Sequence, residues 1–303
     1  MEKSRRHHYL PQCFSEQFAD ENGKLTVYDK DKDCYFPGTP MNLFVEIDRN
    51  SLRDENGIVD DKIERMYSKI DGKFATTLHR VVETGNLSVE DLRLILFLAY
   101  STKWRVPQYD NAFAEAKKLL TVSDLGLRVR SEGKQLAVDL EVAFNSEEKQ
   151  EMKRLLLALQ PFRHTQEYQK IFKNSFLLSS PIPSFIGDCP FNEYPVNTNQ
   201  LFEDFVFPIS KHLTLIHTTR VAKEDLTKAL ERGDYDSFIG AFSRARDCSI
   251  LFTSERFVAC ADRLYLKDIV DIYKTTKARI SSPDLIQCAV FEVLHNYGTY
   301  LHL

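Results

Sequence analysis

The residues with the clearest capacity for chemistry lie near the start of the chain, in the segment His7-His8-Tyr9-Leu10-Pro11-Gln12. Imidazole titrates near neutral pH, so a histidine can act as a general base or as a metal ligand. On an extended segment, however, His7 and His8 point to opposite faces, and only one of them can serve a given site. A structural interpretation competes with the catalytic one: His8 and Tyr9 would pin the N-terminus by hydrogen bonds while Pro11 begins a helix.

The histidine pair, followed by an apolar residue and a proline, resembles the first strand of His-Asn-His nucleases. In those enzymes one histidine activates a water molecule and a divalent metal helps to carry the phosphate charge. The resemblance is incomplete, because the asparagine and histidine expected on a following helix are missing after the first hairpin. It implies catalytic roles for His7 and His8 and a divalent metal as cofactor, whose ligands are unknown.

A carboxylate lies in a second candidate segment, Ile186-Gly-Asp-Cys-Pro190. The end of a strand holds a side chain rigidly, so we expect Asp188 to act as a catalytic base or a metal ligand. The competing interpretation is that Asp188 caps backbone N–H groups in a turn that contains proline. Cys189 is a weaker candidate for a nucleophile, because the sequence offers it no evident base and a buried structural thiol explains it better.

Three polar side chains are candidates for binding a substrate: Gln12, Arg105 and Arg256. Arginine is a natural clamp for phosphate or carboxylate groups. Arg105 ends a predicted helix just before Pro107, where a cation also stabilises the helix C-terminus, so both roles are open. Arg256, in Ser254-Glu-Arg-Phe257, is a weaker candidate of the same kind.

Other patterns argue against several familiar sites. Glu64 and Asp71 lie seven residues apart on a predicted helix and could bind a metal in a bundle, although a solvated face suits them better. His212 and His217 lie five apart on a predicted strand, so they point to opposite faces and make no ligand pair. The sequence contains no glycine-rich phosphate loop, dinucleotide fingerprint, G-x-S-x-G, H-E-x-x-H or C-x-x-C motif.

The composition of the 303 residues, 43% hydrophobic and 28% charged, is that of a globular chain. A net charge of −4 gives no support to a protein that simply coats nucleic acid, although Lys3, Arg5 and Arg6 make a local basic patch. The six cysteines lack paired spacing, and the chain shows neither a secretory leader nor an apolar run of about 18 residues. These features predict a cytoplasmic protein that does not enter a membrane.

Periodicity and turn signals predict more helix than strand. Apolar residues three and four apart predict a helix over residues 59–83, and Ser88-Val-Glu-Asp91 begins a second one that ends near Pro107. Alternation predicts a β-hairpin over residues 24–36. Further helices are expected near residues 11–18, 111–120, 145–160, 166–172, 223–232, 235–252 and 264–274, and strands near 176–191, 205–207, 213–217 and 257–260. Residues 41–57 are expected to be irregular, while 122–144 and 285–297 are ambiguous.

We therefore expect an α+β fold that is predominantly helical. It would contain an N-terminal β-hairpin, a helical bundle and a small mixed β-sheet in the C-terminal half. Composition shifts near residue 176, where prolines and Gly187 appear among apolar residues. The natural division is thus a hairpin plus helical region over residues 1–175 and an α+β region over residues 176–303, sharing one core as a single unit.

Several stretches in the same order resemble the bacterial family catalogued as domain of unknown function 4238. They are residues 7–12 with the strand near 24–30, the helix around 63–72, residues 92–107 ending in Trp-Arg-Val-Pro, and residues 185–190. The resemblance covers most of residues 5–260. Where the family tends to have a Ser-Asp-Asn-Pro turn, this chain has Gly187 and Cys189 around Asp188, so any role of the replaced side chains is in doubt here. The resemblance implies an accessory or defence-type bacterial protein and lends no settled activity.

Two hypotheses of different kinds follow. In the first, the protein is an intracellular effector or enzyme that acts on nucleic acid or nucleotide phosphates in phage defence. His7 or His8 and Asp188 would be its catalytic groups and Arg105 its anion clamp. In the second, it is a non-enzymatic component that binds a protein partner or senses a small ligand. The first hypothesis requires the N-terminal segment to pack beside the Asp188 turn.

Overall fold

The computed structural model describes residues 5–53, 59–60, 62–125, 141–142, 144–146, 152–162, 169, 173–194, 204–218, 235–280 and 283–299. Its longer helices are α2 (Lys62–Thr84), α3 (Val89–Arg105), α4 (Asp110–Ala116), α6 (Met152–Leu159), α9 (Tyr235–Thr253), α10 (Arg263–Thr276) and α11 (Pro283–Thr299). The strands of its two larger sheets are β2 (Leu25–Asp29), β3 (Cys34–Gly38), β7 (Ser175–Ser179), β8 (Ile186–Gly187), β9 (Asn192–Tyr194), β10 (Asp204–Pro208), β11 (Leu213–His217) and β12 (Phe257–Cys260). Shorter elements include β1 (Arg6–His8), α1 (Gln12–Ser15), β4 (Val45–Ile47), β5 (Leu52–Arg53), β6 (Val59–Asp60) and the 3-10 turns η1 (Glu16–Phe18), η2 (Pro40–Asn42) and η3 (Pro107–Tyr109).

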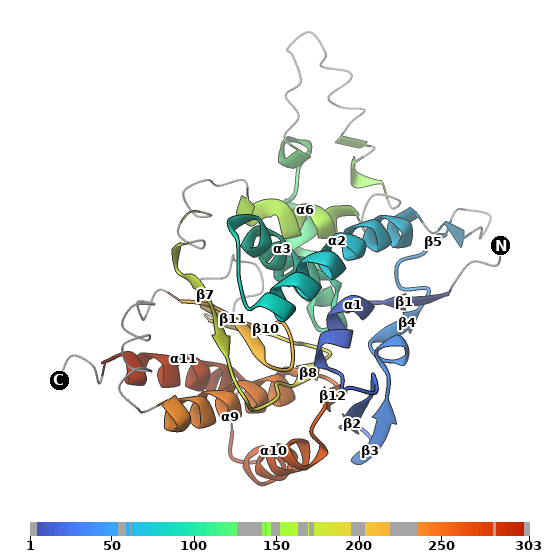
Figure 1. Ribbon diagram of the computed structural model, residues 1–303. Helices are drawn as coiled ribbons and strands as arrows, with labels where there is room; N and C mark the ends of the chain where they lie inside the picture. The colour runs from blue at the N-terminus through green and yellow to red at the C-terminus, as the bar shows by residue number, and fades with distance from the viewer. Residues whose placement is uncertain are drawn as a thin grey trace.

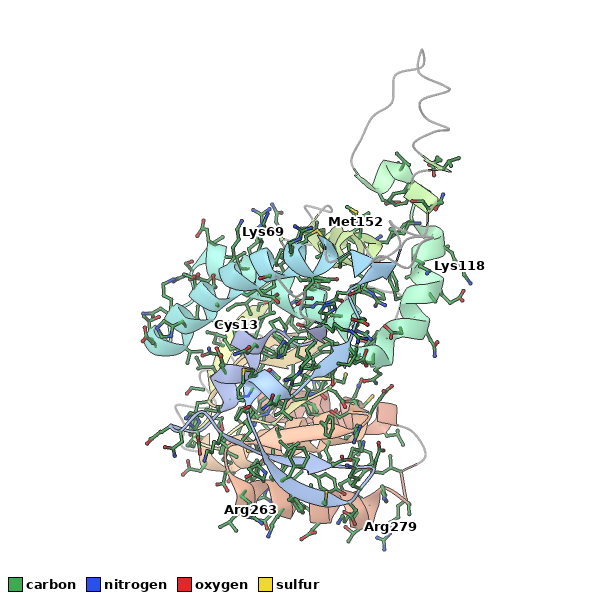
Figure 2. The ribbon with its side chains drawn as sticks, turned by 90° about the vertical axis from the view of Figure 1, so that its right-hand side faces the viewer. Cys13, Lys69, Lys118, Met152, Arg263 and Arg279 are labelled. Atoms are coloured by element: carbon green, nitrogen blue, oxygen red, sulfur yellow. The ribbon has the colours of Figure 1, made fainter. Side chains whose placement is uncertain are left out.

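Helices and sheets are arranged in layers (Figure 1). Helices α2, α3 and α6 form an upper layer, α9, α10 and α11 form a lower one, and the two larger sheets lie between them. Figure 2 shows the same order from the side: Lys69 and Met152 lie on the upper layer, Arg263 and Arg279 lie on the lower one, and Cys13 lies between. The predicted α+β class with mostly helical content is confirmed.

The two long N-terminal helices follow their predicted boundaries closely. Helix α3 begins with a capping box, in which Ser88 Oγ accepts from the Asp91 N–H at 3.2 Å and Asp91 Oδ2 accepts from the Ser88 N–H at 3.0 Å. The helix ends at Arg105 because Val106 takes the extended conformation that a residue before proline prefers. This end determines where the Arg105 side chain leaves the helix.

One larger sheet belongs to the C-terminal half and has the strand order β7-β11-β10-β9. Its residues alternate between two cores, as the period of a strand requires. Phe205 and Phe207 face the main core, to which α3 contributes, whereas Val206 and Ile216 face α9 and α11. Its pairs are antiparallel rather than mixed in direction. For β10 and β11 the reason is their short connection, which makes the chain reverse.

The other larger sheet has the order β3-β2-β12-β8 and joins distant parts of the chain. Its hairpin strands come from residues 1–175, and β12 and β8 come from residues 176–303. Val27 and Ala259 face the main core, while Tyr28 and Val258 face α9 and α10. Asp188 directly follows β8, so this sheet sets its position.

A short strand replaces irregular structure at residues 45–47. Strand β4 pairs antiparallel with β1, with His7 opposite Glu46 and His8 opposite Val45. Phe44 and Asp48, which flank β4, have positive φ angles of 56° and 58°. Three residues are too few to show a period, and their partner is distant in the sequence, so no local pattern could reveal this strand.

Other predictions can be compared only in part. The helix predicted near residues 223–232 lies outside the described residues, as do most of the stretches 122–144 and 166–172. The ambiguous residues 285–297 belong to α11. In the part of the chain that the structure covers, no helix combines the length and the apolar character that a membrane crossing requires.

Gly187 lies where β8 approaches α9 most closely. A Cβ atom at this position would lie 2.0 Å from Ser254 Oγ and 3.0 Å from Ile250 Cγ2. We expect Gly187→Ala to lower the free energy of unfolding by about 1–3 kcal/mol, because the side chains and backbone must shift to admit the methyl group. Denaturant titration measures this change.

Gly240 provides the matched control, because it lies within α9 and a Cβ there would have no neighbour within 4 Å. We expect Gly240→Ala to leave stability unchanged or raise it by up to about 1 kcal/mol. Adding Ser254→Ala to Gly187→Ala should restore part of the loss. Equal stability of the two single alanine variants would contradict the close approach at Gly187.

Candidate functional site

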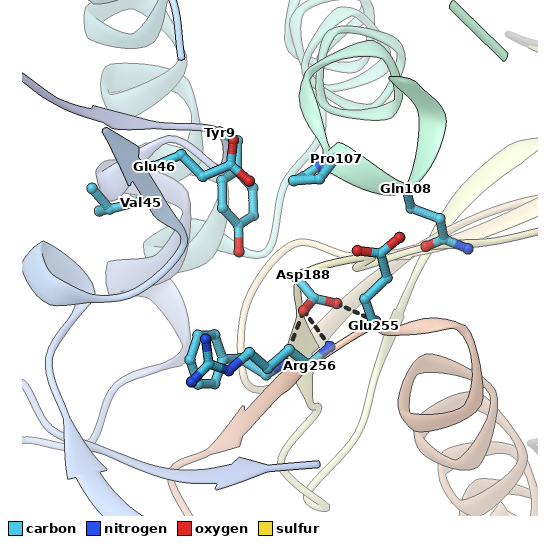
Figure 3. A pocket seen from close by; sticks show the side chains of 9 residues that line it. Tyr9, Val45, Glu46, Pro107, Gln108, Asp188, Glu255 and Arg256 are labelled. Carbon is cyan, nitrogen blue, oxygen red and sulfur yellow. Dashed lines mark hydrogen bonds between the residues drawn. The ribbon is translucent and has the colours of Figure 1, made fainter. Parts of the chain in front are cut away.

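A polar hollow of about 170 Å³ lies where the N-terminal segment, the end of α3 and the turn before β12 meet (Figure 3). It is lined by Tyr9, Val45, Glu46, Pro107, Gln108, Asp188, Glu255, Arg256 and Phe257. These residues come from widely separated parts of the sequence, so the hollow exists only in the folded chain. The N-terminal segment therefore does lie beside the Asp188 turn.

Tyr9 is a largely buried residue whose hydroxyl group opens on the hollow. Its backbone N–H donates to the Phe44 carbonyl at 3.0 Å, and its ring packs edge-on against Phe44 with ring centres 6.1 Å apart. Only 5% of the residue is exposed, and its hydroxyl points toward Asp188 (Figure 3). No hydrogen bond to this hydroxyl occurs within the described residues. Burial raises the pKa of Tyr9, so the hydroxyl stays neutral.

Asp188 forms the floor of the hollow and is held by main-chain donors. Its carboxylate accepts hydrogen bonds from the backbone N–H groups of Glu255, Arg256 and Phe257, each at 2.8 Å. Burial raises the pKa of Asp188, and the three N–H donors oppose that increase. This arrangement matches the capping interpretation: the carboxylate shapes the turn before β12.

Glu46, Gln108 and Glu255 complete the polar lining. Glu46 Oε2 accepts from Arg49 Nη1 at 2.7 Å. The Oε1 atom of Gln108 is buried and has no hydrogen-bond partner in the described part of the chain. The Glu255 carboxylate extends upward between Asp188 and Gln108 (Figure 3), and partial burial and the Asp188 charge raise its pKa.

Arg256 lines the hollow but directs its guanidinium elsewhere. Its Nη2 donates to Asp29 Oδ2 at 3.0 Å, its Nε lies 3.5 Å from Asp31, and it stacks on the Phe257 ring with 4.5 Å to the ring centre. The predicted substrate-binding residue is thus present at the hollow, with its charge already engaged by carboxylates of the β2-β3 hairpin.

The two predicted catalytic histidines do not line the hollow. As expected for an extended segment, they lie on opposite faces of β1. His7 is fully buried, and its Nδ1 accepts from the Asn50 N–H at 3.0 Å. His8 is half-buried, and burial lowers its pKa. The His7 ring thus ties β1 to the chain at Asn50, and neither ring is directed to the hollow.

Arg105 and Gln12 also lie apart from the hollow. The Arg105 side chain is 3% exposed: its Nη1 donates to Asp71 Oδ1 at 2.8 Å, and its Nη2 donates to the His8 carbonyl at 3.0 Å. Gln12 is exposed and donates to Glu16 at 2.9 Å. Arg105 therefore acts as a buried tie between segments in this structure, with its charge paired internally.

The remaining sequence candidates are occupied or buried. Glu64 accepts from the Asn50 side chain at 2.7 Å, while Asp71 binds Arg105, so the two carboxylates serve separate partners. Cys189 is fully buried, and burial raises the pKa of its thiol far above neutrality. Among the residues that the structure describes, no three His, Cys, Asp or Glu side chains are grouped to hold a metal ion.

The fold also contains a buried polar network that the sequence did not reveal. Lys103 Nζ donates to Glu193 Oε2 at 2.6 Å, and the Tyr109 hydroxyl donates to Glu193 Oε1 at 3.0 Å. Burial lowers the pKa of Lys103 and raises that of Glu193. The network joins α3, η3 and β9, and only its place in the fold distinguishes these residues from ordinary surface charges.

A match to a family model identifies the family of this chain. A model described as Protein of unknown function (DUF4238) matches residues 6–259. The chain belongs to the DUF4238 family. No curated protein and no solved structure matches it. Every residue that lines the hollow falls within the DUF4238 region.

The Arg105–Asp71 pair in this DUF4238 chain can be tested by removing one charge. We expect Asp71→Asn to lower the free energy of unfolding by about 3 kcal/mol, because it leaves a buried guanidinium without its counter-charge. Glu115→Gln, which breaks the exposed Lys118–Glu115 pair, should cost less than about 0.5 kcal/mol. A small effect of Asp71→Asn in denaturant titration would contradict the structural role of Arg105.

His8 should make stability depend on pH. Its pKa is lower in the folded chain than the ordinary value of 6.5, so the unfolded chain takes up a proton first as the pH falls. The free energy of unfolding should therefore decrease below about pH 6.5, by less than about 1.4 kcal/mol per pH unit because His8 is partly exposed. Denaturant titrations at several pH values measure this slope, and His8→Asn should flatten it. Parallel curves for both proteins would contradict the prediction.

Proposed function

We propose that this DUF4238 protein is a ligand-sensing component that binds a small molecule in the Tyr9 hollow. The observation that carries the proposal is the Tyr9 hydroxyl: the residue is only 5% exposed, and its hydroxyl opens on the hollow with no hydrogen-bond partner among the described residues. Buried polar groups normally have a partner, and leaving one unsatisfied costs about 1–3 kcal/mol. A ligand would supply the missing partner.

The size of the hollow restricts the ligand. A cavity of roughly 150 Å³ can hold a molecule the size of benzene, and this hollow has about 170 Å³. Pockets for drug-sized molecules have about 300–1,000 Å³. A compound with few non-hydrogen atoms therefore suits the hollow, whereas a whole nucleotide exceeds it.

The position of the hollow suits sensing. A ligand there would contact the N-terminal segment, β4, the end of α3 and the turn before β12 at once. A ligand at about 100 times its Kd adds about 2.7 kcal/mol to the folded state, so occupancy would hold these segments together more firmly. In the form that the family resemblance favours, the protein is a cytoplasmic component of bacterial antiviral defence that signals to a protein partner.

Hydrolysis of nucleic acid or nucleotides is a second proposal with less support. Asp188 lines the hollow and is well placed on a fixed turn. However, a general base must reach the proton that it removes, and neither His7 nor His8 lines the hollow. Divalent metal would have to be held by ligands that the described residues do not group together.

A ligand screen by thermal unfolding tests the main proposal. The full chain is heated with a library of small cationic, neutral and anionic compounds, and with nucleotides, DNA and RNA with and without Mg²⁺. We expect at least one small compound to raise the Tm of the wild-type protein. Glu255→Trp, which places a large side chain in the hollow, should abolish the shift, whereas Val89→Phe at an exposed helix start should retain it.

The outcomes separate the two functions. A Tm shift that Glu255→Trp does not affect, or no shift with any compound, would overturn the ligand-sensing proposal. Cleavage of DNA, RNA or nucleotides that is lost in Asp188→Asn, beside a Gly240→Ala control, would favour hydrolysis instead. Tyr9→Phe, which retains the ring, should weaken binding without changing the fold.

A further inference from the structure

The polar groups that face the hollow can accept hydrogen bonds. The Glu255 carboxylate extends into it and forms no ion pair among the described residues. The Tyr9 oxygen can accept as well as donate. By contrast, the Arg256 Nε and Nη2 groups already donate to Asp29. A ligand that satisfies this lining must therefore supply N–H or O–H donors.

The charges around the hollow favour a positive ligand. Glu46, Asp188 and Glu255 line it, and the one lining cation, Arg256, is turned toward Asp29. Arg49 nearby is paired with both Glu46 and Asp110. A hollow whose lining carries an excess of carboxylates focuses a negative potential, which attracts cations and repels phosphate or carboxylate groups.

An organic cation suits the site better than a bare metal ion. Mg²⁺ or Ca²⁺ requires about six or more oxygen ligands at close range, and the described residues provide no group of three acidic, His or Cys side chains for a metal. The walls also include the apolar ring of Pro107. Such walls can contact a short hydrocarbon body and would leave a hydrated metal ion without partners.

We infer that the ligand is a small organic monocation, a primary ammonium group on a short apolar body. Its N–H groups donate to the Glu255 carboxylate on the side that faces the Tyr9 oxygen, and its body lies against Pro107. This inference rests on the proposed function, because it concerns the same hollow, and adds the charge and chemical class of the ligand.

Isothermal titration of the full chain with four probes tests this assignment. The probes are n-butylammonium, its neutral analogue n-butanol, its anionic counterpart butyrate, and Mg²⁺. We expect n-butylammonium to bind about tenfold more tightly than any other probe. Glu255→Gln should weaken its binding about three- to tenfold, because a partly exposed ion pair contributes modestly. Tyr9→Phe should also weaken it, and Glu83→Gln, at an exposed site on α2, should leave it unchanged.

The result can overturn the inference without overturning the function. Tighter binding of n-butanol, butyrate or Mg²⁺, sensitive to Glu255→Trp, would show a ligand hollow with the wrong charge class assigned. Binding of n-butylammonium that Glu255→Gln and Tyr9→Phe leave unchanged would place it elsewhere and also overturn the inference. If none of the probes binds while the thermal screen finds a neutral or anionic ligand, the charge class is wrong. If the screen finds no ligand, the proposed function fails as well.

Discussion

The buried Arg105 guanidinium joins three parts of the chain that are distant in sequence. It ends α3, pairs with Asp71 on α2 and donates to the carbonyl of His8 on β1, and its guanidinium lies 4.2 Å from the centre of the Tyr67 ring. A buried charge that loses its partner costs several kcal/mol, so these segments must remain together. Because Tyr9 follows His8, the same contact determines where the Tyr9 ring enters the fold.

Asp188 plays a corresponding part on the other side of the hollow. Its three main-chain hydrogen bonds hold the turn that carries Glu255 and Arg256, and β8 before it is held by pairing with β12. Both walls thus depend on buried charges whose hydrogen-bonding capacity is directed to the protein itself. The acceptors on Tyr9 and Glu255 are left for the proposed ligand.

Within the N-terminal motif, the type of a side chain did not indicate whether it would line the hollow. Imidazole is a common acid–base catalyst, yet the His7 and His8 rings lie outside the hollow, whereas the next residue of the motif, Tyr9, lines it. The candidate segments nevertheless meet in the fold, since Tyr9, Asp188 and Arg256 all line the hollow. Their roles depended on which hydrogen bonds the fold had already satisfied, and no pattern of residue types contains that information.

The sequence by itself determined the elements whose stabilising contacts are local. The Ser88 capping box, the end of α3 before Pro107 and the alternation of β2 depend on residues within about four positions of one another. Only the tertiary structure decided that β4 pairs with β1, that β12 lies between β2 and β8, and that Glu46 and Glu255 share a hollow with Tyr9. Those arrangements arise from contacts between residues tens to hundreds of positions apart, where packing and the pairing of buried charges, rather than local preference, select the partner.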